Sequence, residues 1–333
     1  MNSRGQWMLP SGPLPSGAVE RDAWIRAQRP NLDPIRRGLS TDRPAAWLWE
    51  SEPEGAGAVR SVLTVFLTNR ECPWRCLMCD LWRHTTLDSV APGQIPRQID
   101  VALAAAGAVP PRTRLKLYNA GSFFDPAAIP VADHPAIAQR CRGFESVLVE
   151  CHPSLVRDGA RIREFAEQLL PARLEVAMGL ETAHPEILER LNKRMTLQGF
   201  AAAAGVLRDM GCATRAFVLV QPPFLPADQA VAWAERSASF AFNSGVEWVT
   251  LIPTRGGNGA LERLREVGAF TPPTLSTLED AVDAAMASRA GMLLVDVWDL
   301  ERFSEDASTF QARRNRLELM NRLQRVLPRV GAD

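Results

Sequence analysis

The chain has 333 residues, of which 46% are hydrophobic, and its 38 Lys and Arg equal its 38 Asp and Glu in number. This composition is typical of a globular protein with a sizeable core, and the balanced charge excludes a global field that draws the chain to nucleic acid or to an anionic membrane. No apolar run approaches the roughly 20 residues of a membrane span, and the polar amino-terminal segment lacks a signal-peptide pattern, so we expect no membrane contact and a cytoplasmic location.

Residues 1–45 are rich in proline, glycine and arginine, with one amphipathic piece at 19–28, and predict an irregular extension that wraps the main domain. The segment at 45–51 alternates in polarity, and we expect it to pair with the next strand through the turn at 52–59. Runs of valine, leucine and phenylalanine then predict strands at residues 61–67, 114–120, 145–151, 173–180, 214–220, 247–253 and 292–298.

Helical patterns separate these strands, at residues 97–106, 158–169, 184–192, 198–210, 227–243 and 277–290, and a last helix is expected at 309–326. Strand-helix alternation of this length favours right-handed parallel crossovers. We therefore predict an α/β fold, a partial (β/α)6 barrel of the TIM type over residues 46–300, with a helical tail at 301–333. A doubly wound open sheet is the alternative, although no GxGxxG follows the first strand.

The stretch ECPWRCLMCDLWRH places Cys72, Cys76 and Cys79 directly after the strand at 61–67, at the end of a barrel strand where such folds carry their chemistry. In a reducing compartment, clustered cysteines favour a metal or redox role over disulfides. Structural zinc needs four ligands, and only His84 lies near enough in sequence to complete such a site. An iron-sulfur cube held by three thiolates leaves one iron open.

This motif resembles the CxxxCxφC motif of the radical S-adenosylmethionine superfamily, with Met78 at the φ position. The resemblance implies the partial barrel, one 4Fe-4S cluster bound by the three cysteines, and S-adenosylmethionine on the open iron. It further implies reductive cleavage of S-adenosylmethionine to methionine and a 5′-deoxyadenosyl radical, with an electron donor such as flavodoxin or ferredoxin.

Two further strand ends are similar to elements of that superfamily. NAGSFFD corresponds to the GGE element near the methionine ammonium, which implies roles for Asn119, Gly121 and Ser122 although the acidic residue is missing; an ordinary turn is the alternative. VECHP is similar to the E-x-x-P of oxygen-independent coproporphyrinogen oxidases, which implies that Glu150 holds the ribose hydroxyls.

The fourth strand runs into MGLETAHPEILERLNKRMT, which is similar to a segment of the Elongator catalytic subunit, the methylthiotransferases and the porphyrin enzymes. This likeness places Glu181 at the barrel mouth. It also implies that Lys193, or the adjacent Arg194, binds the methionine carboxylate, and the sequence leaves that choice open.

The loops VLVQPPFLP and TLIPTRGGNG are similar to those of archaeosine-type radical enzymes, which act on a lysine-bearing deazaguanine in transfer RNA, except that Gln221 replaces their lysine. Substrate contacts are predicted for Gln221, Tyr118, and Arg255 and Asn258 of the glycine-rich loop. The remaining cysteines, Cys141, Cys151 and Cys212, are isolated, so we predict a single cluster.

The leading hypothesis is therefore a radical enzyme that takes hydrogen from a small-molecule or nucleoside substrate. The alternatives are an archaeosine-type enzyme that modifies transfer RNA, and a non-catalytic iron-sulfur or zinc scaffold or sensor. Nucleic acid is possible but not favoured: the basic tail is expected to serve packing or a partner, although it carries Arg313, Arg314, Arg316, Arg322, Arg325 and Arg329.

Overall fold

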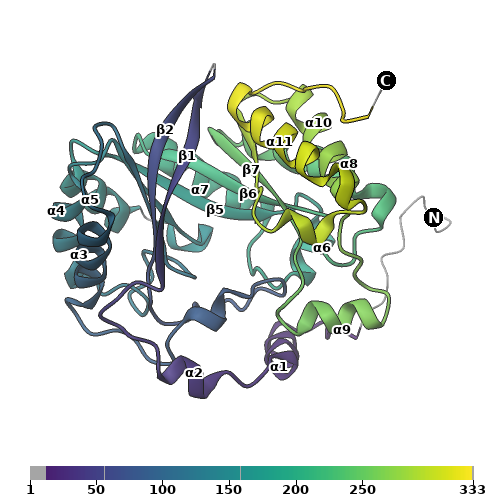
Figure 1. Cartoon of the computed structure of the whole chain (residues 1–333). Helices are drawn as coiled ribbons and strands as arrows, with labels where there is room; N and C mark the ends of the chain where they lie inside the picture. The colour runs from purple at the N-terminus through teal and green to yellow at the C-terminus, as the bar shows by residue number, and fades with distance from the viewer. Residues whose placement is uncertain (1–12, 56, 158, 332–333) are drawn as a thin grey trace.

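The computed structural model describes residues 13–55, 57–157 and 159–331. Its centre is one curled sheet of eight strands whose order in space equals their order in the chain (Figure 1). The first pair is antiparallel and every later pair is parallel. The strands are β1 (Ala46–Gly55), β2 (Ala58–Phe66), β3 (Arg114–Tyr118), β4 (Ser146–Glu150), β5 (Arg173–Glu181), β6 (Ala213–Val220), β7 (Trp248–Pro253) and β8 (Met292–Val295).

All seven strands predicted in the barrel are confirmed within a few residues, and so is the pairing of the segment at 45–51 with the first of them. The sequential strand order contains no reversal, which a doubly wound sheet requires, so the open-sheet alternative is wrong. The strands have continuous apolar sequences because both faces of the sheet are buried. Helices cover the outer face, and the curl of the sheet encloses the inner face.

Helices connect the parallel strands and cover the sheet (Figure 1). They are α1 (Ala18–Gln28), α2 (Asp33–Arg37), α3 (Gln94–Ala106), α4 (His134–Cys141), α5 (Ala160–Leu169), α6 (Pro185–Arg190), α7 (Leu197–Asp209), α8 (Ala230–Asn243), α9 (Ala260–Glu266), α10 (Leu275–Ala287) and α11 (Ala307–Leu323). The sequence predicted α3, α5, α6, α7, α8, α10 and α11, and an amphipathic piece where α1 lies, but it did not predict α2, α4 or α9. No helix among the described residues is long and apolar enough to cross a bilayer.

Ion pairs inside the barrel show how strongly the sheet curls. Arg215, at the start of β6, donates to Glu52 of β1 at 2.7 Å and to Glu175 of β5 at 2.8 Å. In a flat sheet β1 and β6 would lie roughly 24 Å apart, given about 4.8 Å between neighbouring strands. The contact therefore spans the interior. Lys116 of β3 adds a second cation beside Glu52, at 2.8 Å.

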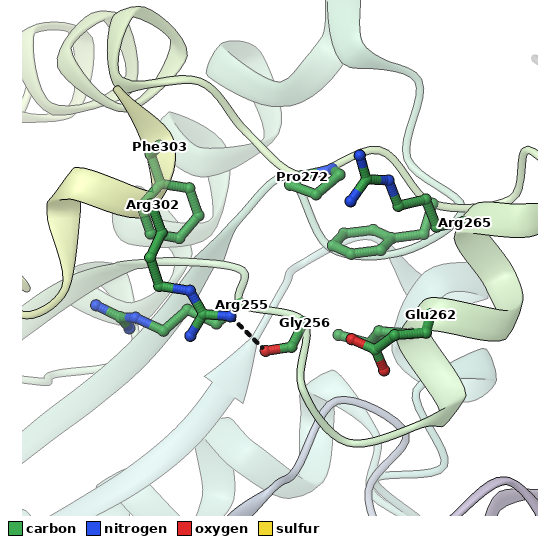
Figure 2. A pocket seen from close by; sticks show the side chains of 9 residues that line it. Arg255, Gly256, Glu262, Arg265, Pro272, Arg302 and Phe303 are labelled. Atoms are coloured by element: carbon green, nitrogen blue, oxygen red, sulfur yellow. Dashed lines mark hydrogen bonds between the residues drawn. The ribbon is translucent and has the colours of Figure 1, made fainter. Parts of the chain in front are cut away.

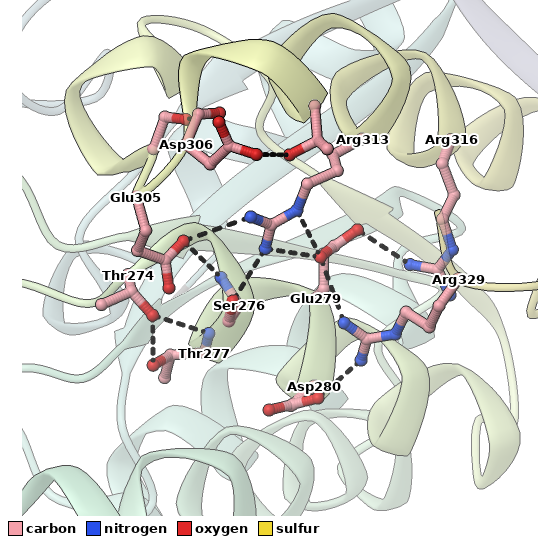
Figure 3. A network of polar contacts seen from close by, with 12 residues as sticks. Thr274, Ser276, Thr277, Glu279, Asp280, Glu305, Asp306, Arg313, Arg316 and Arg329 are labelled. Carbon is pink, nitrogen blue, oxygen red and sulfur yellow. Dashed lines mark hydrogen bonds and ion pairs between the residues drawn. The ribbon is translucent and has the colours of Figure 1, made fainter. Parts of the chain in front are cut away.

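The carboxyl-terminal tail is held to the barrel by a network of charges between α10 and α11 (Figure 3). Glu279 of α10 forms ion pairs with Arg313 at 2.8 Å, Arg329 at 3.1 Å and Arg316 at 3.4 Å. Arg316 also pairs with Asp283 at 2.7 Å. These three arginines of the basic tail are thus occupied by acids of the neighbouring helix, as the expected packing role requires.

Candidate functional site

The three motif cysteines lie on the loop that leaves β2 at the carboxyl edge of the sheet, and neighbouring elements hold the backbone of this loop from several sides. Leu77 N–H donates to the carbonyl of Leu191 at 2.9 Å. Asn192 Nδ2 donates to the carbonyls of Trp74 at 3.2 Å and Arg75 at 3.1 Å. These contacts from neighbouring elements fix the conformation of the loop backbone.

The amino-terminal extension also contacts this loop. Glu71, which directly precedes Cys72, pairs with Arg29, the residue after α1, at 2.7 Å and with Arg36 of α2 at 3.2 Å. A Cβ atom on Gly259 would lie 2.0 Å from the carbonyl oxygen of Gln28, so the glycine-rich loop passes close to α1 as well. The sequence did not predict these contacts, because the extension carries no motif that indicates which residues it contacts.

All three motif cysteines are free thiols, with Cys76 buried and Cys72 and Cys79 half-buried. Burial raises the pKa of Cys76 to about 12, and Lys193 opposes this rise. Burial and the two neighbouring thiolates raise the pKa of Cys79 well above its usual range. Metal binding requires deprotonated thiols, and iron would supply the positive charge that this site needs to release their protons.

Three thiolates are the protein donors of an iron-sulfur cube that leaves one iron open. Among the described residues, no three His, Cys, Asp or Glu side chains are placed to hold one metal ion. His84, the possible fourth zinc ligand, is exposed at the end of a 3-10 helix, Leu81–His84. In a cube each thiolate binds a different iron, so its three cysteines do not have to converge on one point.

The loop after β3 presents small and polar groups to the cysteine loop. A Cβ atom on Gly121 would lie 3.2 Å from Cβ of Cys72, so only a very small residue packs there without displacement. Asn119 is fully buried, and neither its amide oxygen nor its amide nitrogen has a partner among the described residues. Ser122 Oγ accepts from His152 N–H at 2.9 Å and is thus partly engaged. Of these two polar side chains, Asn119 is the one whose hydrogen bonds are missing.

Glu150 ends β4 beside these groups. Burial raises its pKa to about 7, the Glu181 charge adds to the rise, and the Asn119 N–H and Lys193 oppose it. A carboxyl group in such surroundings is stabilised by a ligand that donates hydrogen bonds to it. The adjoining Cys151 is buried in the core, and its thiol lies 3.4 Å from the carbonyl of His152.

Lys193 and Arg194 lie in different surroundings. Lys193 Nζ pairs with Glu181 Oε1 at 2.8 Å in the interior, and this pair lies directly over Gly179, where a Cβ atom would clash with both side chains. Arg194 instead pairs with Asp22 of α1 at 2.6 Å. The geometry therefore brings Lys193, not Arg194, to the mouth.

Backbone strain accumulates where strands meet the mouth. Ala120, Glu181 and Gln221 have φ values of 47°, 66° and 55°, in the left-handed region that non-glycine residues seldom adopt. They follow or end β3, β5 and β6 respectively. Strained residues persist when the surroundings fix them, and they are frequent at binding sites.

The predicted substrate residues are distributed around the same edge. Gln221 donates to the carbonyl of Thr271 at 2.7 Å, and its own amide oxygen is buried without a partner among the described residues. Half-buried Tyr118 lies with its ring centroid 5.8 Å from that of Phe66. Asn258 Nδ2 donates to the carbonyl of Leu77 at 2.6 Å, so this side chain is already engaged in fixing the cysteine loop.

One contact at the mouth was not predicted. The rings of Trp74 and His152 stack with their centroids 4.1 Å apart, and His152 Nε2 lies 2.8 Å from the carbonyl oxygen of Lys193. Burial and the Lys193 charge lower the pKa of His152 to about 3, so the ring is neutral. His152 thus links the cysteine loop to Lys193; the only sequence signal was its place after a strand. Met78, at the φ position, packs partly buried against the apolar cluster around Leu77.

Comparisons with known proteins agree with this architecture. No model of a protein family matches the sequence. The archaeosine synthase subunit beta of Methanosarcina acetivorans is 25% identical over 264 residues, which cover 77% of this chain and 75% of that protein. The protein of the same name from Thermococcus kodakarensis is 26% identical over 237 residues, 68% of this chain and 72% of that one.

Among solved structures, the Elp3 protein of Methanocaldococcus infernus, which lacks its amino terminus, is similar with a TM-score of 0.50 and 13% identity. The match covers 68% of this chain and 58% of that chain, so it spans less than two thirds of Elp3. At this identity the likeness concerns the fold. The predicted likeness to archaeosine-type proteins is confirmed by these relatives, and the predicted α/β barrel fold is confirmed by the structure.

Proposed function

We propose that this chain is a radical S-adenosylmethionine enzyme whose 4Fe-4S cluster is bound by Cys72, Cys76 and Cys79. The observation that carries the proposal is the meeting of three free thiols on one loop with a fully buried Asn119 whose amide has no hydrogen-bond partner among the described residues. Buried polar groups without partners are rare, and at a barrel mouth they favour a polar ligand.

Different residues of the chain would bind different parts of S-adenosylmethionine. Lys193, which stays charged beside Glu181, would receive the methionine carboxylate, while Glu181 is available to the ammonium group. Glu150 would accept hydrogen bonds from the ribose hydroxyls, and the amide of Asn119 would complete the polar lining. The bound cluster would supply one electron that breaks a carbon-sulfur bond of S-adenosylmethionine, giving methionine and a 5′-deoxyadenosyl radical that takes a hydrogen atom from the substrate.

We further propose a small-molecule or nucleoside-sized substrate and an electron donor such as flavodoxin or ferredoxin. The second candidate, an archaeosine-type enzyme acting on transfer RNA, is supported by relatives that are named archaeosine synthase subunit beta. That name describes those proteins as subunits, so a partner chain belongs to this candidate. Occupation of Arg313, Arg316 and Arg329 by acids of α10 favours the smaller substrate for this chain alone, because these guanidinium groups already have partners.

Reconstitution tests the activity directly. The chain is loaded anaerobically with iron and sulfide, reduced with dithionite and mixed with S-adenosylmethionine, and 5′-deoxyadenosine is measured by mass spectrometry. We expect turnover to fall to background in Cys76→Ala and to persist in Cys212→Ala, which removes a buried thiol elsewhere in the core. A reduced, intact cluster that never forms 5′-deoxyadenosine would favour the scaffold or sensor instead.

A further inference from the structure

A cavity of about 250 Å³ lies between the loop after β7, helix α9, the segment before α10 and the 3-10 helix Leu300–Phe303 (Figure 2). In Figure 2 Arg255 and Arg302 lie on one side and Arg265 and Glu262 on the other. The full lining consists of Arg255, Gly256, Leu261, Glu262, Arg265, Phe270, Pro272, Arg302 and Phe303.

The guanidinium groups of this cavity are not all neutralised. Arg255 pairs with Asp296 at 2.7 Å. Arg302 donates to the carbonyl of Gly256 at 3.1 Å but has no acidic partner within the described residues, and the side chain of Arg265 has neither a hydrogen bond nor an ion pair there. This contrasts with Arg313, Arg316 and Arg329 of the tail, each of which pairs with at least two acids.

The one carboxylate in the lining belongs to Glu262 and is engaged by the backbone. Its Oε2 accepts from the N–H of Gly259 at 2.6 Å, and its Oε1 accepts from the N–H of Gly257. The Glu262 carboxylate therefore reduces the positive potential of the cavity but forms no ion pair with Arg265 or Arg302 within the described residues. Arg255, Arg265 and Arg302 carry three positive charges, and the carboxylates of Glu262 and Asp296 offset two of them, which leaves one net positive charge.

The rest of the lining is apolar. Phe270 and Phe303 are only 4% and 6% exposed, and Pro272 and Leu261 contribute further carbon surface. Such a combination of ring faces and arginine forks suits a ligand with a flat ring at one end and an anionic group at the other.

We infer that this cavity binds the phosphate and part of the ring system of a mononucleotide-like molecule. Phosphate is favoured over carboxylate because guanidinium forks approach from two sides, and three phosphate oxygens can accept from both sides at once. The volume lies below the roughly 300 Å³ at which ligand pockets usually begin, so the cavity would hold the phosphate and the nearer part of the ring system and leave the rest of the molecule outside.

The position of the cavity connects it to the candidate active site. Its Arg255 and Gly256 belong to the same loop as Asn258, which donates to the carbonyl of Leu77 inside the cysteine motif. The loop that lines the cavity therefore also holds the backbone of the cysteine loop. That the molecule bound in the cavity is the substrate rests on the proposed function, whereas the anion site itself does not.

Equilibrium binding to the full chain tests the site without any turnover. Guanosine 5′-monophosphate is compared with guanosine and inorganic phosphate by calorimetry; a guanine nucleotide avoids the adenosine group that S-adenosylmethionine carries. We expect the nucleotide to bind at least tenfold more tightly than guanosine. Replacing both arginines, as Arg265→Gln with Arg302→Gln, should weaken nucleotide binding at least tenfold.

Arg263→Gln is the matched control, because Arg263 lies on the same helix but pairs with Glu266 at 2.8 Å, and it should bind the nucleotide like the parent chain. Arg265→Gln alone keeps the test valid if the double variant is unstable, since the side chain of Arg265 has no hydrogen-bond or ion-pair partner among the described residues. Equal binding of nucleotide and guanosine, or unchanged binding in Arg265→Gln and the double variant, would overturn the inference. Nucleotide binding in a chain that never cleaves S-adenosylmethionine would count against the proposed function only.

Discussion

Buried polar and charged side chains occur both in the seam, the contact between α10 and the tail that contains α11, and at the mouth of the barrel. They are paired in the seam, whereas some of them lack partners at the mouth. In the seam, Glu279 satisfies three arginines, which also bind other acids (Figure 3). At the mouth, the amide of Asn119 is buried without a partner in the described part of the chain, and Glu150 has a raised pKa. A satisfied network serves stability, whereas an unsatisfied one favours a ligand. The two regions should therefore respond differently to mutation.

The largest stability effect is expected in the seam. Glu279→Ala removes the acid shared by Arg313, Arg316 and Arg329, and breaking a buried ion pair on one side costs about 3–5 kcal/mol. Urea denaturation should show this loss, while affinity for S-adenosylmethionine in the surviving folded protein stays unchanged. Glu318→Ala, which breaks an exposed pair with Arg314, is the control and should cost less than about 1 kcal/mol. A loss from Glu279→Ala as small as that would show that the seam is not structural.

Glu150→Gln should stabilise the metal-free protein in a pH-dependent way. Because folding raises the Glu150 pKa from 4.5 to about 7, ionisation of the wild-type carboxyl does not lower the free energy of unfolding below pH 4.5. The loss of free energy grows between pH 4.5 and pH 7 and is constant at higher pH. At pH 8 the amide should gain up to about 3 kcal/mol, at 1.36 kcal/mol for each pKa unit. Urea denaturation at pH 4.5 and pH 8 checks this, and a pH-independent difference would contradict it.

Asn119→Ala should separate binding from stability. Its amide makes no hydrogen bond within the described residues, so the free energy of unfolding should change by less than about 1 kcal/mol. If the amide contacts S-adenosylmethionine, equilibrium dialysis with the reconstituted protein should show affinity reduced about tenfold, because a hydrogen bond to a charged group contributes about 1.5–3 kcal/mol. Unchanged affinity would remove Asn119 from the site.

Sequence reasoning located the strands and the cysteine loop because their signals are local. Apolar runs mark buried parallel strands, and the motif spacing fixes three thiols on one loop. It could not identify the stacking of Trp74 on His152 or the engagement of Asn258 with Leu77, because these pairs join segments far apart in the chain. The assignment between Lys193 and Arg194 also depended on tertiary contacts, with Glu181 and Asp22 respectively.

The smallest effect is predicted for Arg194→Ala. Arg194 is partly exposed, and its pair with Asp22 joins the loop before α7 to α1, so its removal should cost about 0–1 kcal/mol of stability. It should also change affinity for S-adenosylmethionine less than threefold, because the side chain does not contact Glu181. Lys193→Met, which keeps most of the side-chain length without the charge, should instead reduce affinity at least tenfold. Equilibrium dialysis on both reconstituted variants measures the difference, and circular dichroism verifies that each is folded. If Arg194→Ala has the larger effect, the mouth must rearrange on binding, because in this structure only Lys193 lies beside Glu181 and close enough to Cys76 to oppose the rise in its pKa.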